Sequence, residues 1–151
     1  MTTERPPAPD ATEVSVVGIG ADGWAGLAPS ARAALGRARV VIGSRRQLGL
    51  LPASGAHLVP WPSPLLPALP GLLEEHSGDG LVVLASGDPM FFGVGRAVTE
   101  LLGAGRVTVL PHPSSVSLAC ARLGWPLEEV PVVSVVGRPM QGAGPAGAAS
   151  R

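Results

Sequence analysis

Three glycines follow the first apolar run of the chain with the spacing of a dinucleotide-binding loop. The segment VVGIGADGWAG (16–26) holds Gly18, Gly20 and Gly23 in the pattern G-x-G-x-x-G. In a dinucleotide site, a helix starts inside such a loop, so that its N-terminus faces the pyrophosphate. Here the first good helix start is Pro29, about five residues too far along the chain. The glycines alone are therefore weak support for a nicotinamide cofactor.

Two arginines follow the second apolar run, where a dinucleotide site would place an acidic residue for the ribose hydroxyls. The segment IGSRRQ (42–47) offers Arg45 and Arg46, and guanidinium groups would suit a 2′-phosphate. An NADP-binding oxidoreductase therefore remains an alternative, which a fluorescence test with NADPH would support or dismiss.

A second loop with candidate binding residues, SGDPMFFG (86–93), comes directly after the pattern of a buried strand. Asp88 stands between a glycine and a proline, and its carboxylate can cap the following backbone N–H groups or contact a ligand. The aromatic pair Phe91-Phe92 follows it closely. A plain turn rich in Gly, Asp and Pro is the alternative interpretation.

A third loop, PHPSS (111–115), follows another expected strand. Ser114 or Ser115 is expected to cap the helix that comes next. His112 can carry a proton, and a structural or solvent-facing histidine is the alternative.

Strand-like and helix-like segments alternate along the chain, which predicts an α/β fold with a mostly parallel sheet flanked by helices. In such sheets, ligands bind at the carboxyl ends of the strands, where all three loops would lie. The strands are expected over 14–19, 39–43, 57–61, 81–86, 106–110 and 130–136, and the helices over 29–38, the second half of 65–76, 94–103 and 116–124.

The chain of 151 residues is long enough for one domain with a substantial core. A polar, Pro-rich lead is expected at 1–12, the α/β domain at 13–137 and a low-complexity, disordered tail at 138–151. The tail cannot bury an apolar face. The chain is therefore expected to stop before the helix that a parallel α/β domain would add.

Composition argues against several classes of function. The formal net charge is zero, which gives no electrostatic attraction for nucleic acid or an anionic membrane. No signal peptide is visible, and no apolar stretch approaches the roughly 20 residues that span a bilayer. Cys120 is the only cysteine, so no internal disulfide can form, which fits a reducing cytoplasm. Its thiol is expected to be buried. The three histidines are scattered, so no metal site is expected.

Four segments resemble the tetrapyrrole (corrin/porphyrin) methyltransferases in sequence and in order: VVGIGADGW, VVIGSRRQL, VLASGDPMFFGVGR and PHPSSVSLACARLGW. The first loop and GDPMFFG are typical of the superfamily. VIGSRRQL followed by ASGDPMFFGVGR is similar to the precorrin-6Y C5,15-methyltransferase branch, and within it to the C5-methylating domain of cobalamin biosynthesis. The resemblance runs from Val14 to Pro139.

The resemblance implies S-adenosylmethionine as the methyl donor, bound in a cleft between two α/β domains, of which this chain holds the N-terminal one. The family usually has proline at position 21 and a Pro-Gly pair where this chain has Pro111-His112-Pro113, so the local backbone is expected to differ there. The positions that match the family's cofactor contacts are Ala21, Ser86, Gly87, Asp88, Phe91, Ser114 and Ser115.

The resemblance also implies a corrin precursor with several carboxylates as the substrate, methylated at C5. Arg45, Arg46 and His112 are candidate contacts to it, because arginine pairs well with carboxylates. An exposed arginine pair that serves solubility is the alternative. No catalytic residue is assigned, because transfer from a sulfonium depends mainly on positioning.

A second domain would complete the cofactor cleft in this family. The chain alone is therefore expected to bind S-adenosylmethionine weakly or not at all, and to complete the cleft with a partner domain or as a homodimer. A truncated, non-catalytic remnant is the second interpretation. A downstream reading frame for another α/β domain would favour an incomplete enzyme.

Overall fold

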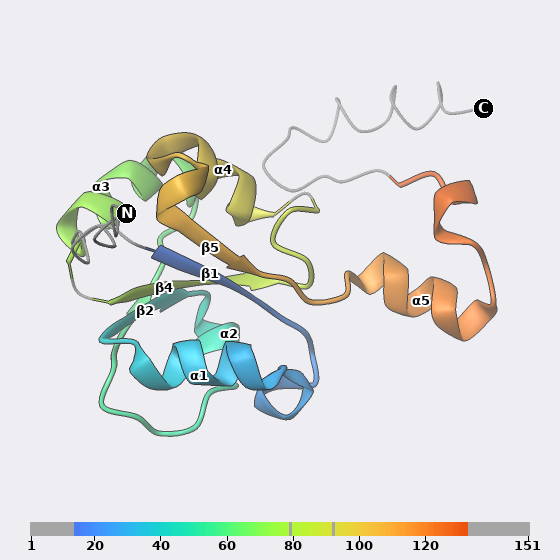
Figure 1. Ribbon diagram of the computed structural model, residues 1–151, viewed down its shortest axis with the longest axis horizontal. Coiled ribbons are helices and arrows are strands. Elements are labelled where there is room, and N and C mark those ends of the chain that lie inside the picture. The colour runs from blue at the N-terminus through green and yellow to red at the C-terminus, as the bar shows by residue number, and fades with distance from the viewer. Residues whose placement is uncertain (1–13, 79, 92, 133–151) are drawn as a thin grey trace, which may run out of the picture.

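A parallel sheet of five strands lies at the centre of the computed structural model, which describes residues 14–78, 80–91 and 93–132 (Figure 1). All its strand pairs are parallel, and the spatial order is β3-β2-β4-β1-β5. The carboxyl ends of β4, β1 and β5 are therefore neighbours. The strands are β1 (Val14–Ile19), β2 (Val40–Gly43), β3 (His57–Pro60), β4 (Leu81–Ser86) and β5 (Val107–Leu110).

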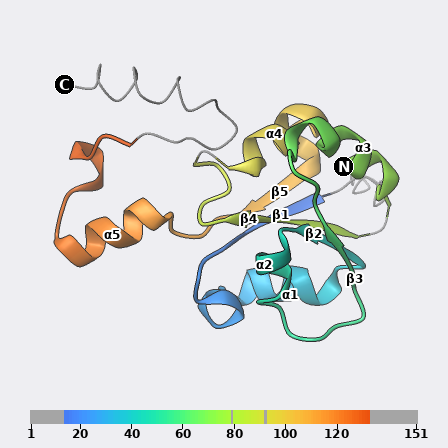
Figure 2. The same ribbon diagram turned by 180° about the vertical axis from the view of Figure 1, so that it is seen from behind.

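Helices cover both faces of the sheet, α1 and α2 on one face and α3 and α4 on the other (Figures 1 and 2). Among the described residues, no helix has the length and apolar composition needed to cross a membrane. The α-helices are α1 (Pro29–Arg37), α2 (Arg45–Leu48), α3 (Leu69–Glu75), α4 (Val94–Leu102) and α5 (Ser115–Leu123). Short 3-10 turns are η1 (Gly23–Gly26), η2 (Leu66–Ala68), η3 (Ala104–Arg106) and η4 (Leu127–Glu129).

The core consists of two apolar layers, because successive strand residues point to opposite faces of the sheet. Val16 and Val83 pack with α3 and α4, whereas Val17 and Leu84 pack with α1 and α2. Both faces are buried, which explains why β1, β2 and β4 read as continuous apolar runs. Each such side chain contributes about 1.5–3 kcal/mol on burial.

The strand and helix predictions are confirmed over most of the described chain, with bounds that differ by one or two residues. The prolines at 67 and 70 were expected to confine the helix to the second half of 65–76. In fact a 3-10 turn already begins at Leu66, and Pro70 occupies the first turn of α3, where its missing N–H is not needed. The short helix α2 was not predicted.

The strand expected over 130–136 lies only in part within the described residues. Residues 130–132 are not in a strand, and the rest of the strand expected over 130–136 lies outside the described residues. The expected lead at 1–12 and tail at 138–151 also lie outside them.

Helix α5 projects away from the sheet (Figures 1 and 2). Its ends are as predicted: the Ser114 hydroxyl accepts from the Ser117 N–H at 3.0 Å, and Gly124 ends the helix with φ of +70°. Cys120 is buried, as predicted, against the segment that follows the helix. Neither core layer includes a described residue of α5.

Candidate ligand site at the carboxyl end of the sheet

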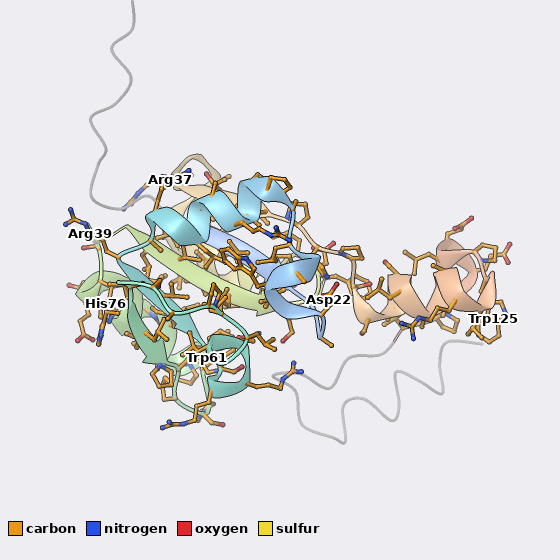
Figure 3. All side chains as sticks on the ribbon, turned by 90° about the horizontal axis from the view of Figure 1, so that it is seen from below. Asp22, Arg37, Arg39, Trp61, His76 and Trp125 are labelled. Atoms are coloured by element: carbon orange, nitrogen blue, oxygen red, sulfur yellow. The ribbon has the colours of Figure 1, made fainter. Side chains whose placement is uncertain are left out.

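The three loops that the sequence singled out lie together, as predicted, because they follow the neighbouring strands β1, β4 and β5. The Gly87 N–H donates to the Ile19 carbonyl at 2.9 Å. A Cβ added to Gly87 would lie 3.2 Å from the Ser114 Cα. Figure 3 shows Asp22 of the first loop at this end of the sheet, with His76 and Arg39 at the opposite end.

The need for glycine at positions 18 and 20 is explained by atoms of the other two loops, which leave no room for a side chain. A Cβ on Gly18 would overlap the Gly87 carbonyl oxygen and lie 2.9 Å from the His112 Cβ. A Cβ on Gly20 would lie 2.6 Å from the His112 Nε2. Both distances are shorter than real Cβ contacts. The G-x-G pattern is therefore accounted for by packing, with no dinucleotide required.

The His112 side chain of the third loop packs against Gly18 and Gly20 of the first loop. This side chain is 9% exposed, and its Nε2 lies 3.9 Å from Asp22 Oδ1. The solvent-facing interpretation is therefore wrong, and the structural one agrees with the packing over the two glycines. At 3.9 Å no hydrogen bond forms between the two side chains.

The first loop does not have the geometry of a dinucleotide site. Gly23 adopts φ of +63° and begins the turn η1, and the first α-helix starts only at Pro29, as predicted. The Asp22 carboxylate occupies the space beside Gly26, where an added Cβ would overlap it. The first α-helix therefore begins outside the glycine loop, and its N-terminus is not part of that loop.

The second loop is a tight turn held by its own backbone and by Asp88. Gly87 has φ of +64°, a conformation that favours glycine. Asp88 Oδ1 accepts from the Met90 N–H at 2.9 Å, which is the capping role anticipated for it. Gly95 donates to the Pro89 carbonyl at 3.0 Å. Phe91 is exposed, and Phe92 lies outside the described residues.

The other predicted cofactor contacts differ in how free their side chains are. Ser114 is buried and occupied as the N-cap of α5, and its hydroxyl also pairs with that of Ser117 at 3.0 Å. Ala21, Ser86 and Ser115 are exposed. In the third loop, the groups free to contact a ligand are therefore the Ser115 side chain and backbone groups, because the Ser114 hydroxyl is already used.

Gln47 is a buried polar residue at this end of the sheet that the sequence reasoning missed. It is 1% exposed, and its Nε2 donates to the Ser86 Oγ at 2.8 Å. The capping box S-x-x-Q, from Ser44 to Gln47, was a visible pattern that would have located the start of α2. The link to Ser86 spans 39 residues and has no local pattern.

Arg45 and Arg46 form the first turn of α2, at the carboxyl end of β2. Both are exposed, and in the described part of the chain neither guanidinium has a hydrogen-bond or ion-pair partner. The structure thus places them on the same side of the sheet as the three loops, without joining them to these loops.

The described residues contain no group of three or more His, Cys, Asp and Glu side chains that could hold a metal ion. His57 begins β3 and therefore lies at the amino end of the sheet, 6.4 Å from the ring of His76. Of the three histidines, His112 alone lies among the loops. The arrangement is suited to binding and orienting a small polar ligand.

The family profile of the tetrapyrrole (corrin/porphyrin) methylases matches residues 13–150. A precorrin-6Y C(5,15)-methyltransferase (decarboxylating) of Mycobacterium tuberculosis is 49% identical over 124 residues, which are 82% of this chain and 31% of that protein. A cobalt-precorrin-7 C(5)-methyltransferase of Salmonella typhimurium is 32% identical over 125 residues, which are 83% of this chain and 62% of that protein. The chain therefore spans less than two thirds of either relative.

Solved structures agree with these sequence matches. The precorrin-6Y methylase of Archaeoglobus fulgidus superposes with a TM-score of 0.66 at 31% identity, over 81% of this chain and 64% of that one. A uroporphyrin-III C-methyltransferase of Thermus thermophilus, complexed with S-adenosylhomocysteine, gives a TM-score of 0.53 at 28% identity, over 69% of this chain and 46% of that one. By its profile match, its sequence relatives and its parallel fold, the chain belongs to the tetrapyrrole (corrin/porphyrin) methylase family.

Proposed function

We propose that the chain is the N-terminal, cofactor-binding domain of a methyltransferase that transfers a methyl group from S-adenosylmethionine to C5 of a corrin precursor in cobalamin biosynthesis. The convergence of three loops beside β4, β1 and β5, in a member of this family, carries the proposal. The names of the two curated relatives, both of which include C5, support the position of methylation.

The exposed groups beside β4 fit an adenosyl sulfonium ligand. Asp88 uses Oδ1 for its turn, which leaves Oδ2 to face a cationic group. Phe91 offers an exposed aromatic ring, which can contact a cation or an adenine. Ser86 and Ser115 add exposed hydroxyls. The proposed cofactor contacts are Ala21, Ser86, Gly87, Asp88, Phe91, Ser114 through its backbone, and Ser115.

Positioning is the main task of these residues. When bound, S-adenosylmethionine supplies a methyl group that is attached to a positively charged sulfur. The leaving group is a neutral thioether, so it needs no proton. The rigid turn at Gly87 and Asp88 fixes the groups that would orient the donor, and holding two reactants in line supplies much of the rate acceleration. No nucleophilic side chain is required, and we assign no catalytic residue.

We propose Arg45 and Arg46 as contacts for carboxylates of the corrin substrate, since both guanidinium groups are exposed at the carboxyl end of β2. His112 is the third candidate contact, although its side chain is enclosed and its Nε2 lies beside Gly20 and Asp22. Residues 13–137 would form the domain, in the cytoplasm. A second domain, or a second copy of the chain, would complete the cleft.

A crystal soaked with S-adenosylhomocysteine tests the proposal. We expect density for the adenosine within contact of Ser86, Asp88 and Phe91. Density that lies elsewhere, for example beside Arg39 at the opposite end of the sheet, would contradict it.

A further inference from the structure

We infer that Gln47 is a positioning residue that makes the Ser86 hydroxyl a hydrogen-bond donor to an acceptor atom of the bound cofactor. The inference rests on the proposed function, because Ser86 is one of the proposed cofactor contacts. It starts from the Gln47 side chain, which is 1% exposed at the carboxyl end of the sheet and whose amide oxygen and amide nitrogen each have a hydrogen-bond partner.

The orientation of the Gln47 amide is fixed by a group that can only donate. The Ser44 backbone N–H donates to Gln47 Oε1 at 2.9 Å. The amide oxygen must therefore face Ser44, which directs Nε2 toward Ser86. The Ser44 hydroxyl in turn accepts from the Gln47 backbone N–H at 3.1 Å, which completes the capping box.

The direction of the amide determines what Ser86 can do. Nε2 has no lone pair and donates to Ser86 Oγ at 2.8 Å, so the hydroxyl proton cannot point toward Gln47. In the part of the chain that the structure describes, no other group accepts that proton. Ser86 is exposed at the carboxyl end of β4. Its hydroxyl therefore presents a donor to the site.

The backbone makes room for this arrangement at Gly43, the last residue of β2. A Cβ added to Gly43 would lie 3.2 Å from Gln47 Oε1 and 3.0 Å from Leu84 Cδ1. The end of β2 is thus linked to the end of β4 by one packed and hydrogen-bonded arrangement of Gly43, Ser44 and Gln47. A capping box alone would explain Ser44 but would not require Gln47 to reach Ser86.

Gln47→Glu tests the inference because glutamate also completes a capping box and should keep α2 intact. When ionised, its carboxylate accepts hydrogen bonds only, so the Ser86 hydroxyl would turn inward to donate to it. The titration is run at about pH 9, because burial raises the pKa of a glutamate. We expect the affinity for S-adenosylhomocysteine to fall about tenfold, the size of one lost hydrogen bond. NMR titration of the ¹⁵N-labelled full chain measures this even when binding is weak.

Two further variants separate positioning from charge. Gln47→Met removes the amide but leaves Ser86 able to donate, so we expect a loss of only about twofold to threefold. In a Ser86→Ala background, Gln47→Glu should weaken binding no further. An equal loss in that background would show that the new charge acts directly on the ligand, and it would overturn the inference.

A measurement without ligand keeps the inference testable if a variant fails to fold. The Gln47 side-chain NH₂ should exchange slowly with solvent in the wild-type chain and faster in Ser86→Ala. Fast exchange in the wild type would overturn the inference. Wild-type binding that is insensitive to Gln47 would remove the inference alone, whereas wild-type ligand shifts that avoid Ser86 and Asp88 would remove the cofactor assignment together with it.

Discussion

The glycines at positions 18 and 20 differ in what an added methyl group would meet. At Gly18 the nearest atom is a backbone carbonyl oxygen, which cannot move without shifting the second loop. At Gly20 it is the far end of the His112 side chain. We therefore expect Gly18→Ala to lower the free energy of unfolding by about 3 kcal/mol and Gly20→Ala by about 1 kcal/mol. Denaturant unfolding measures both.

Two further variants control for that comparison. Replacing His112 by alanine should remove part of the penalty of Gly20→Ala, because the nearest blocking atom is gone while Asp22 Oδ1, 2.9 Å from the added Cβ, remains. Gly36 in α1 has nothing within 4 Å of an added Cβ, so Gly36→Ala should stabilise the chain by about 0.5–1 kcal/mol. Equal losses for Gly18→Ala and Gly20→Ala would contradict the packing explanation.

At the residue scale, local patterns were predictable and long-range ones were not. The N-cap at Ser114, the helix-ending Gly124 and the capping by Asp88 each depend on neighbours a few residues away. The roles of Gln47 and of Gly18 depend on residues that only the sheet brings near. The G-x-G pattern was visible in the sequence, but its cause in His112 was not.

At the scale of elements, the core strands were the most predictable because they are buried on both faces and read as unbroken apolar runs. The helix α2 was missed because its four residues are too few to show a helical period. The position of α5 could not be predicted, because its capping residues define where it begins and ends but not what it packs against.

Helices α4 and α5 are both nine residues long, but only α4 packs against the core. We therefore expect the amides of α5 to exchange with solvent faster than those of α4, through a local opening. Ser114→Ala should reduce the protection of α5 further, by about 1 kcal/mol, because it removes the N-cap. Hydrogen exchange read by mass spectrometry or NMR measures both effects.

Ser115→Ala is the matched control for that experiment, since Ser115 is exposed and makes no capping bond. It should leave the protection of α5 nearly unchanged. Equal protection of α4 and α5 in the wild-type chain would contradict the separation of α5 from the core.

At the scale of the whole molecule, α5 and the residues after it present large apolar side chains to solvent. Leu123 and Trp125 are each 58% exposed. Exposed apolar surface of this kind favours association. We expect the chain to self-associate with rising concentration, and Leu123→Glu or Trp125→Glu to reduce it, as measured by sedimentation velocity.

Leu66→Glu serves as the control, because Leu66 is 52% exposed on η2, a different part of the surface. It should leave self-association unchanged. A reduction as large as that of the α5 variants would mean that general charge, rather than this surface, governs association.

The most direct test of the account is an NMR map of the ¹⁵N-labelled chain titrated separately with S-adenosylhomocysteine and with NADPH. With S-adenosylhomocysteine we predict shifts concentrated at Ser86–Phe91, Ala21 and Ser115, and with NADPH none at Gly18–Gly23. NADPH shifts at those glycines, or S-adenosylhomocysteine shifts that avoid Asp88 and its neighbours, would contradict the placement of the cofactor beside β4.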